Sequence, residues 1–481
     1  MTDIAFKPAT ELVADIKARR IGALELLEHY LARIDKYDGA INAVVVRDFE
    51  RARQRARAAD EALAKGEDWG PLHGLPMTLK ESYNVEGLPT SWGLPMFKDN
   101  IAPAHSVVAQ RFADAGAVIF GKTNIPTLLA DWQSYNDNYG ETSNPWDLAR
   151  SPGGSSGGSG AALAAGLTGL ESGSDIAGSI RNPAHFNGVF GLKPTLGIIP
   201  LRGHAVVEVA APIDISCVGP LGRSADDLEL ALDVTAGADL LQAPGWKLAL
   251  PRDERGSLAD YRVAIWADSD LAPVDASVGD RIAELGQRLA KLGATVDDKA
   301  RPDFAPAHSH ELFNRLLFAA LASRQPDEAL EAAKAAVAAN PAHPDPMARG
   351  AATWHHEWLS LNEQRTQLRY RWLEFFRDYD VLICPINTTA AFLKDHHEPQ
   401  NERRLTINGA PRPYQDSFFW AGLVGVSHLP AAVGPVGRTA EGLPVGLQFV
   451  APETHDRRAI NFARLVAREL GGFAPPPGYD A

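Results

Sequence analysis

The sequence predicts an α/β fold with a mixed, largely parallel central sheet that helices cover on both faces. From Gly70 onward, short apolar runs typical of buried strands alternate with stretches whose apolar residues recur every three or four positions. The first such unit is a helix expected over 105–116, followed by a strand over 117–121. Because this alternation is typical of strands connected through helices, it favours that fold class.

The same order returns in the second half of the chain. A strand is expected over 261–268, an amphipathic helix over 277–292 and a strand over 294–296. Two further apolar runs, 380–385 and 443–451, are predicted to be buried strands. The C-terminal part of the chain is therefore expected to return to the central sheet.

The first 65 residues have a helical pattern, because apolar residues recur there at steps of three and four. Arginines at 47, 51, 53, 55 and 57 are interleaved with acidic residues, as on a solvated helix face, so no nucleic acid site is predicted there.

Four segments are expected within one compact unit. Residues 1–65 would form N-terminal helices packed on the core, and residues 66–240 the core itself. Residues 241–379 would form a variable, largely helical region that sets substrate specificity, since an insertion over 300–378 is of the kind that caps a site. Residues 380–481 would complete the core sheet.

The composition is that of an ordinary globular protein: 481 residues, 45% of them hydrophobic and 22% charged. Acidic residues (60) outnumber basic ones (47), and the net charge of −13 opposes binding to a nucleic acid backbone or an anionic membrane. Cys217 and Cys384 are the only cysteines and lie far apart, which predicts neither a disulfide scaffold nor a structural zinc cluster.

Charged residues interrupt every apolar stretch near the N-terminus, unlike a signal peptide, and we expect a cytoplasmic protein. The stretch 418–437 is about as long as a membrane span, with His428 as its only ionisable residue. Because prolines and glycines interrupt it, we interpret it as core strands and turns, with membrane contact as the alternative.

The segment 152–195 has the strongest functional signal. Its first nine residues resemble a flexible linker, but an alanine-rich stretch and an apolar run follow. A phosphate-binding loop would need a Gly-Lys-Ser/Thr ending, which this segment lacks. A match to G-x-S-x-G would make Ser155 the nucleophile of a hydrolase elbow, but no apolar strand precedes it as that elbow requires.

Three motifs, taken in order, resemble the amidase signature family. GLPMTLKE (74–81) is similar to the segment that ends in the family's catalytic lysine, here Lys80. GGSSGG (153–158) is similar to the segment with its cis-peptide serine, here Ser155, and GSDIAGSIR (173–181) places its nucleophile at Ser179. The resemblance is strong over 70–200, continues more weakly to the C-terminus, and implies the amidase signature fold.

The resemblance implies an amidohydrolase that cleaves a carboxylic amide to acid and amine or ammonia through a serine acyl-enzyme. Neutral Lys80 would take a proton from Ser155, which would take one from Ser179 as that oxygen attacks the carbonyl. A lysine acts as a base only when its pKa falls, and the apolar residues before Lys80 suit this. The oxyanion would be held by the backbone N–H groups of Ile176, Ala177, Gly178 and Ser179.

Other residues of the signature segment match family positions that support the triad, namely Ser156, Ser174, Asp175 and Arg181. The last two are expected to fix the nucleophile loop, with a purely structural pair as the alternative. Ala177 stands where the family more often has glycine, so its methyl group is expected to narrow the site. The acyl pocket is expected near Leu129, Trp132 and Tyr135, for which core packing is the alternative.

Other functions of the same family stay open. One is an amidotransferase component that hydrolyses glutamine and passes ammonia to a charged tRNA; others are an esterase, a urethane hydrolase and a binding protein without catalysis. Neither a metal nor an organic cofactor is expected, although the histidine pairs 308/310, 355/356 and 396/397 resemble metal ligands. The expected partner is a small-molecule amide rather than a nucleic acid or a membrane, and a homodimer is one oligomeric state that fits.

Overall fold

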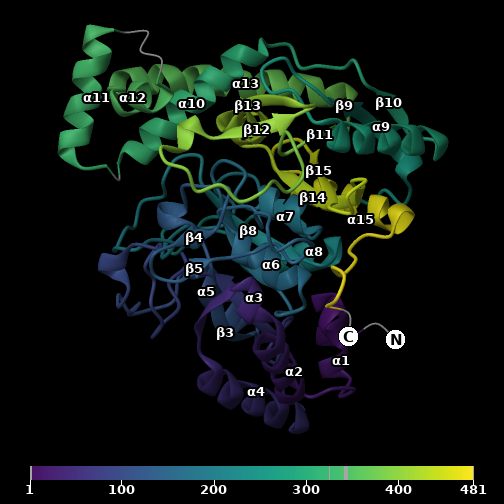
Figure 1. Cartoon of the computed structure of the whole chain (residues 1–481). Coiled ribbons are helices and arrows are strands. Elements are labelled where there is room, and N and C mark those ends of the chain that lie inside the picture. The colour runs from purple at the N-terminus through teal and green to yellow at the C-terminus, as the bar shows by residue number, and fades with distance from the viewer. Residues whose placement is uncertain (1–2, 324, 341–344, 480–481) are drawn as a thin grey trace.

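The computed structural model describes residues 3–323, 325–340 and 345–479. In this part of the chain an eight-stranded sheet occupies the centre, the N-terminal helices lie at one end, and α10–α13 lie at the opposite end (Figure 1). We call the group α10–α13 the cap.

The central sheet has the strand order β10-β9-β11-β15-β14-β7-β8-β6. In chain order its described strands are β6 (Glu171–Asp175), β7 (Phe190–Lys193), β8 (Cys217–Gly222), β9 (Arg262–Ile265), β10 (Thr295–Asp297), β11 (Val381–Cys384), β14 (Ala431–Arg438) and β15 (Pro444–Val450). The strands predicted over 380–385 and 443–451 are β11 and β15, so the C-terminal segment does return to the sheet.

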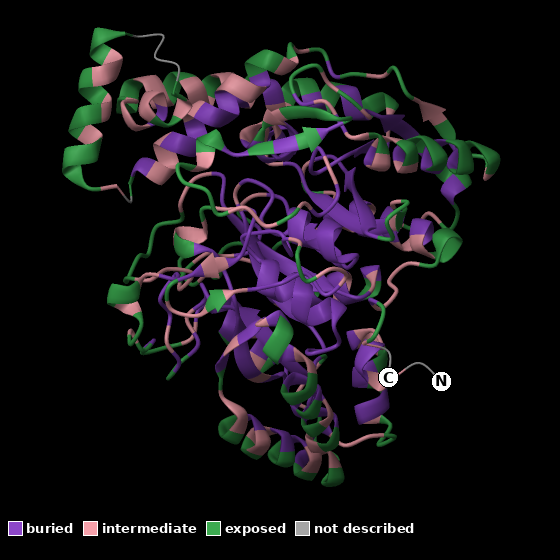
Figure 2. Ribbon diagram, in the orientation of Figure 1, coloured by how far each residue is buried: buried purple, intermediate pink, exposed green. Residues whose placement is uncertain are grey.

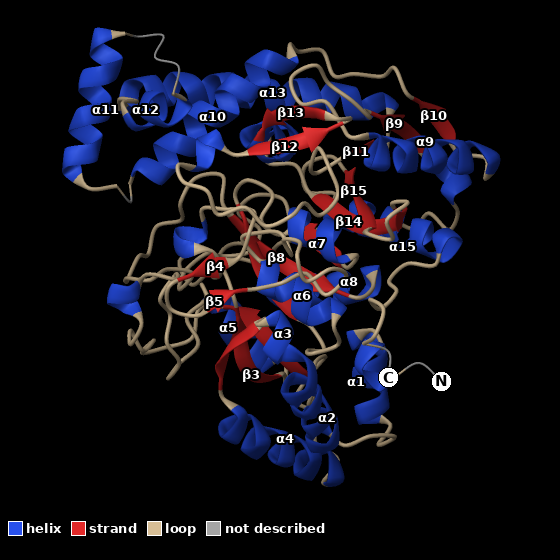
Figure 3. Cartoon of the chain, viewed as in Figure 1, coloured by secondary structure: helices blue, strands red, loops and turns tan. Residues whose placement is uncertain are grey.

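The predicted mixed sheet flanked by helices is confirmed (Figure 3), but its parallel part is smaller than expected. Among the described strands of this eight-stranded sheet, β9 pairs in parallel with β10 and β11, and the remaining neighbours are antiparallel. Parallel pairing requires a crossover connection, whereas β14 and β15 are joined by a short turn and β7 reaches β8 through a loop without a described helix.

A second, three-stranded sheet has the order β1-β3-β2, with β1 (Val44–Arg47), β3 (Val118–Thr123) and β2 (Pro76–Lys80). Strand β2 meets the region before β6 through backbone hydrogen bonds from Thr78 to Leu170 (3.4 Å) and from Gly169 to Pro76 (3.3 Å). This junction brings the last residue of β2, Lys80, next to the edge strand of the central sheet.

Helices pack against both sheets and connect their strands. Those outside the cap are α1 (Ala9–Lys17), α2 (Ala23–Arg33), α3 (Gly39–Ile41), α4 (Phe49–Ala64), α5 (Val107–Asp114), α6 (Gly157–Ala164), α7 (Arg181–Asn187), α8 (Ala225–Thr235), α9 (Ala276–Lys291), α14 (Phe418–Gly425) and α15 (Asp456–Leu470). Of the arginines on α4, Arg51 and Arg57 are exposed, as predicted, whereas Arg53 and Arg55 are half-buried. Arg53 donates to Glu28 and Glu50 at 2.6 Å each.

The cap contains α10 (Pro306–Ala322), α11 (Asp327–Ala339), α12 (Pro346–Ala351) and α13 (His355–Asp378). A β-hairpin lies beside it in Figure 1, with strands β12 (Arg404–Ile407) and β13 (Ala410–Pro413). A smaller hairpin in the core joins β4 (Tyr135–Asn136) to β5 (Gly140–Glu141).

The apolar stretch 418–437 corrects one expectation, because its first part is helix α14 rather than a strand or turn. Its second part enters β14, and most of both elements is buried in the core. None of the described helices is long and apolar enough to cross a membrane.

Candidate active site

Lys80 lies at the C-terminal end of β2 and is completely buried. Its Nζ donates hydrogen bonds to the Oγ atoms of Ser155, at 2.7 Å, and of Ser174, at 3.0 Å. Two of the predicted site residues, 75 and 94 positions from Lys80 in sequence, therefore contact it directly.

Burial lowers the pKa of Lys80 to about 7, although the negative charges of Asp175, Glu171 and Glu81 act in the opposite direction. An amine with this pKa is partly unprotonated at neutral pH, which an exposed lysine is not. The buried end of β2 thus holds an amine that can act as a base.

Ser155 belongs to a glycine-rich loop that precedes α6, and its peptide bond to Gly154 is cis. A Cβ atom on Gly154 would lie 2.3 Å from the carbonyl oxygen of Asp131, so only glycine fits there. This loop is tied to residues 176–180, the loop that contains the predicted nucleophile, because the N–H of Ser156 donates to the carbonyl of Ser179 at 3.1 Å. We call residues 176–180 the nucleophile loop.

Ser179 lies between β6 and α7, in a loop that the carboxylate of Asp175 holds from inside. Asp175 accepts from the N–H groups of Gly178 (2.8 Å) and Ile180 (3.1 Å). Gly178 has φ +97°, a conformation that favours glycine. Together these contacts bend the chain so that Ser179 faces the cavity described below.

The predicted oxyanion hole needs one correction, at Gly178. Its N–H already donates to Asp175 and is not available to a substrate. Among the described residues, no acceptor takes the N–H groups of Ile176, Ala177 or Ser179. Three of the four predicted donors thus remain, and the fourth holds the loop.

Arg181 forms a completely buried ion pair with Asp175, at 2.9 Å. Burial alone would raise the pKa of Asp175, but attraction by Arg181 holds it well below its usual value. Arg181 also donates to Oε1 of Gln448 at 2.6 Å, and Gln448 in turn donates to the carbonyl of Pro385 at 2.7 Å. Sequence reasoning missed Gln448, whose signal was a single polar residue in the apolar run 443–451.

Glu171 is a second buried acid that sequence reasoning missed, although it stands alone among small and apolar residues of the signature segment. Its Oε1 accepts from Oγ1 of Thr78 at 2.5 Å, two residues before Lys80 on β2. Burial raises the pKa of Glu171 to about 7. Its charge therefore changes in the same pH range as that of Lys80.

A cavity opens next to these residues and is lined by Ser155, Ser174, Ala177 and Ser179 together. Its apolar wall comes from the loop after β3, from the cap and from α14, with Leu128, Leu129, Trp132, Leu317, Phe318 and Phe418. The rings of Trp132 and Phe418 lie 4.6 Å apart and those of Phe318 and Phe418 6.4 Å apart, so this wall is continuous. His204 and Ser216 add polar groups.

Of the predicted acyl pocket residues, Leu129 and Trp132 line this cavity. Tyr135 is not among its described lining residues, but its hydroxyl donates to Asp131, which is, at 3.3 Å. The ring of Tyr135 stacks on His396 at 3.9 Å, and its hydroxyl accepts from the buried Arg403 at 2.9 Å. The lining residues from the cap and α14 were missed, because they have no motif and only folding brings them to the site.

Asp131 is the charged residue of the described cavity wall, and each of its carboxylate oxygens has a hydrogen-bond partner. Arg403 pairs with one carboxylate oxygen at 2.5 Å, and the hydroxyl of Tyr414 donates to the other at 2.6 Å. Arg403 also pairs with Glu398 at 2.7 Å. These contacts hold the segment around residue 400 against the loop that contains Leu129.

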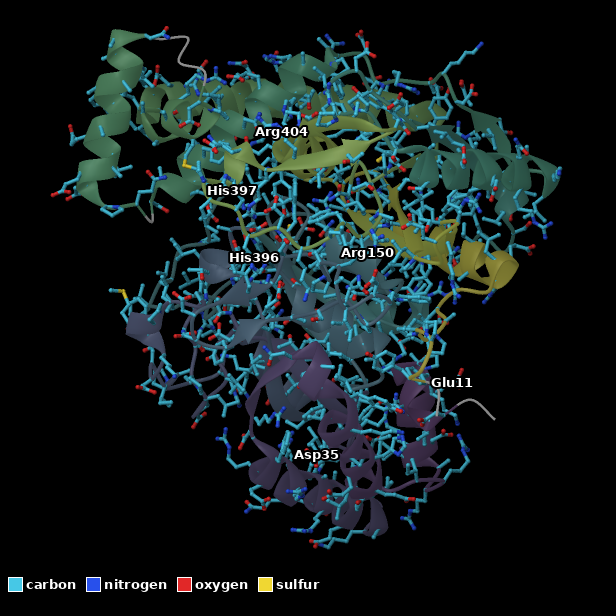
Figure 4. The ribbon with its side chains drawn as sticks, in the orientation of Figure 1. Glu11, Asp35, Arg150, His396, His397 and Arg404 are labelled. Atoms are coloured by element: carbon cyan, nitrogen blue, oxygen red, sulfur yellow. The ribbon has the colours of Figure 1, made fainter. Side chains whose placement is uncertain are left out.

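The histidine pairs do not form metal sites in the described structure. His396 pairs with Glu141 at 2.8 Å and His397 with Glu402 at 3.3 Å, both where the cap meets the core (Figure 4). Throughout the described ranges, no three or more His, Cys, Asp and Glu side chains form a group that could hold a metal ion.

Comparison with known proteins agrees with this geometry. The family model "Amidase" matches residues 25–460. An indoleacetamide hydrolase of Bradyrhizobium diazoefficiens is 31% identical, over 97% of this chain and 87% of its own length. An acylamidase of Rhodococcus erythropolis is 32% identical, over 94% of both chains. A glutamyl-tRNA(Gln) amidotransferase component of Anaeromyxobacter sp. (strain K) is also 32% identical, over 97% of both chains.

A solved amidase structure has the same fold, with a TM-score of 0.77 and 27% identity. The match covers 97% of this chain and 100% of that one. Because the family model and relatives more than 30% identical both span nearly the whole chain, this protein belongs to the amidase signature family.

Proposed function

We propose that this chain is a serine amidase with the triad Lys80, Ser155 and Ser179. The observation that supports this most strongly is the 2.7 Å hydrogen bond between Nζ of Lys80 and Oγ of Ser155, in a buried position that lowers the pKa of the lysine to about 7. A buried lysine of this kind can accept a proton, and the serine that it contacts lines the same cavity as Ser179.

In the proposed acylation, Lys80 takes a proton from Ser155 while Ser155 takes one from Ser179. The Ser179 oxygen then bonds to the amide carbonyl carbon, and the carbonyl oxygen becomes an oxyanion. The N–H groups of Ile176, Ala177 and Ser179 hold this charge; the loss of one such donor costs about 2.7 to 4 kcal/mol of activation free energy.

Collapse of the tetrahedral intermediate breaks the carbon–nitrogen bond. Ser155 gives its proton to the leaving nitrogen and regains one from the Lys80 ammonium. Water then attacks the acyl-enzyme along the same proton path and releases the acid. The Asp175–Arg181 pair, anchored by Gln448, keeps the nucleophile loop in place during both steps.

We infer that the acyl group is apolar or aromatic, because leucine, tryptophan and phenylalanine side chains form the apolar wall. An indoleacetyl group, which the name of the Bradyrhizobium relative implies, has this character. Glutamine fits less well, because no lysine or arginine is among the described residues of the wall to bind its α-carboxylate. The amidotransferase reaction is therefore the second candidate.

The test begins with a fluorophosphonate, which forms a covalent adduct with an activated serine. Peptide mapping should find the adduct on Ser179; an adduct on Ser155 would contradict the proposed roles. Turnover should then be measured with aryl amides, with aliphatic amides and with glutamine, before and after treatment with EDTA. We expect the highest kcat/KM for aryl and aliphatic amides and no loss after chelation, because the nucleophile and its base are both side chains. A homodimer and a cytoplasmic location stay predictions.

A further inference from the structure

The cavity contains a histidine that the reaction sequence above does not use. His204 lines it together with Ser174 and Ser216, on a loop between β7 and β8. Ser216 directly precedes Cys217, which pairs with Asp175 in the central sheet. These polar groups therefore gather near the start of the nucleophile loop.

The backbone at His204 is held in one position by a tight turn. The N–H of His204 donates to the carbonyl of Leu201 at 2.9 Å, and Gly203 between them has φ +84°. A Cβ atom on Gly203 would lie 2.5 Å from Cα of Ser106, so the turn packs directly on that segment. The carbonyl of Gly203 also accepts from the N–H of Asn84 at 2.9 Å, which fixes the turn to the chain just beyond β2.

The ring of His204 is oriented from the same direction. Its Nε2 lies 2.8 Å from Oγ of Ser82, two residues after Lys80. The rings of Tyr83 and Trp92 lie 5.0 and 5.4 Å from the imidazole, and both side chains are buried. The imidazole is thus placed against the end of β2 that provides the base.

The path of proton transfer indicates where the leaving nitrogen of the substrate lies in the cavity. The leaving nitrogen must receive its proton from Ser155, and Ser155 is hydrogen bonded to Lys80. The nitrogen must therefore lie beside Ser155, in the cavity that His204 also lines. The acyl group then occupies the apolar wall formed by Trp132, Phe318 and Phe418.

We propose that His204 is a leaving-group residue of the amidase: its imidazole contacts the departing nitrogen and thereby favours amides over esters of the same acid. This inference rests on the proposed amidase function. It adds no proton transfer, since Ser155 still protonates the nitrogen. A leaving group that carries N–H bonds gains the contact, and a phenolate oxygen that leaves without a proton needs it less.

The experiment compares His204→Ala with wild type on two substrates that share the phenylacetyl group, phenylacetamide and 4-nitrophenyl phenylacetate. We expect kcat/KM to fall about 10- to 100-fold for the amide, the size of one hydrogen bond to a developing charge, and at most about 3-fold for the ester. His204→Asn should recover part of the amide activity. The control His356→Ala changes an exposed residue of α13 and should alter neither value.

The rate of fluorophosphonate labelling at Ser179 distinguishes failure of the leaving-group role from failure of the amidase function. Normal labelling of His204→Ala with equal losses on amide and ester would overturn the leaving-group role and leave the amidase function intact. Wild type that neither labels at Ser179 nor turns over either substrate would overturn the proposed function itself. If His204→Ala does not fold, His204→Asn is judged by the same amide-to-ester ratio, and an unchanged ratio overturns the role.

Discussion

Residues 151–195 and the cap differ in how far their side chains are buried. Within 151–195 every residue except Ile176 is buried, whereas α11 of the cap has no buried residue and the cap as a whole is largely exposed or half-buried (Figure 2). The buried segment nevertheless contains charged and hydroxyl groups, among them Asp175, Ser179 and Arg181. Burial lowers the pKa of Lys80 next to this segment, and the packed loop fixes the backbone N–H donors around Ser179.

The cap contributes only apolar side chains of α10, together with Met347 of α12, to the described cavity wall. It supplies no group of the proposed triad or oxyanion hole. We therefore propose that the buried segment sets the reaction and that the cap helps to set the acyl group. Four predictions test this division.

Variants of the triad in the buried region should lose the most activity. Ser179→Ala and Lys80→Ala should each lower kcat by about 10⁴-fold or more with little change in circular dichroism, because the nucleophile or its base is missing. Lys80→Arg should not restore activity, since a guanidinium stays charged. Activity within tenfold of wild type in either lysine variant would exclude Lys80 as the base.

Removal of Asp175 should cost stability as well as activity. Asp175→Ala leaves Arg181 buried without its partner charge, and the free energy of unfolding should fall by about 3–5 kcal/mol. Glu441→Ala, which breaks an exposed ion pair with Arg150, is the matched control and should cost at most about 1 kcal/mol. Urea denaturation compares the two, and equal midpoints would show that the buried pair does not stabilise the loop.

In the cap, the loss should be smaller and should depend on the substrate. Phe318→Ala should lower kcat/KM about tenfold for phenylacetamide and much less for acetamide, because only the larger acyl group reaches the apolar wall. Glu331→Ala, on the outer helix α11, should change neither value. A similar loss for both amides would mean that the cap affects the reaction rather than acyl selection.

The mildest change concerns the pH profile. Only neutral Lys80 accepts a proton, so kcat/KM of wild type should fall about tenfold per pH unit below its pKa of about 7 and level off above it. The negative charge of Glu171 raises this pKa, and Glu171→Gln should therefore move the acid limb to lower pH, by less than about one unit. Asp456→Asn, a buried acid bonded to Thr195, is the control, and an equal shift there would contradict a specific effect of Glu171.

Local pattern was sufficient to predict much of the fold. The helix expected over 277–292 is α9 (Ala276–Lys291), where Ile282, Leu285 and Leu289 turn one apolar face inward. The direction of pairing was predicted less well: a largely parallel sheet was expected, but most neighbours in the central sheet are antiparallel. A buried strand has the same composition in parallel and antiparallel neighbours, so its composition does not decide the direction. The direction depends on the connections, as the short turn between β14 and β15 shows.

The three motifs with Lys80, Ser155 and Ser179 could be identified from the amino-acid sequence, since these residues lie in short segments with a characteristic order and spacing. Three other features are seen only in the folded structure: the N–H of Gly178 donates to Asp175, Gln448 anchors Arg181 from 267 positions away, and His204 lines the cavity. They could not be predicted because hydrogen bonding and desolvation depend on every segment packed around a group. Likewise, the sequence identifies Lys80 as the candidate base, but its burial in the folded chain lowers its pKa enough for it to act as one.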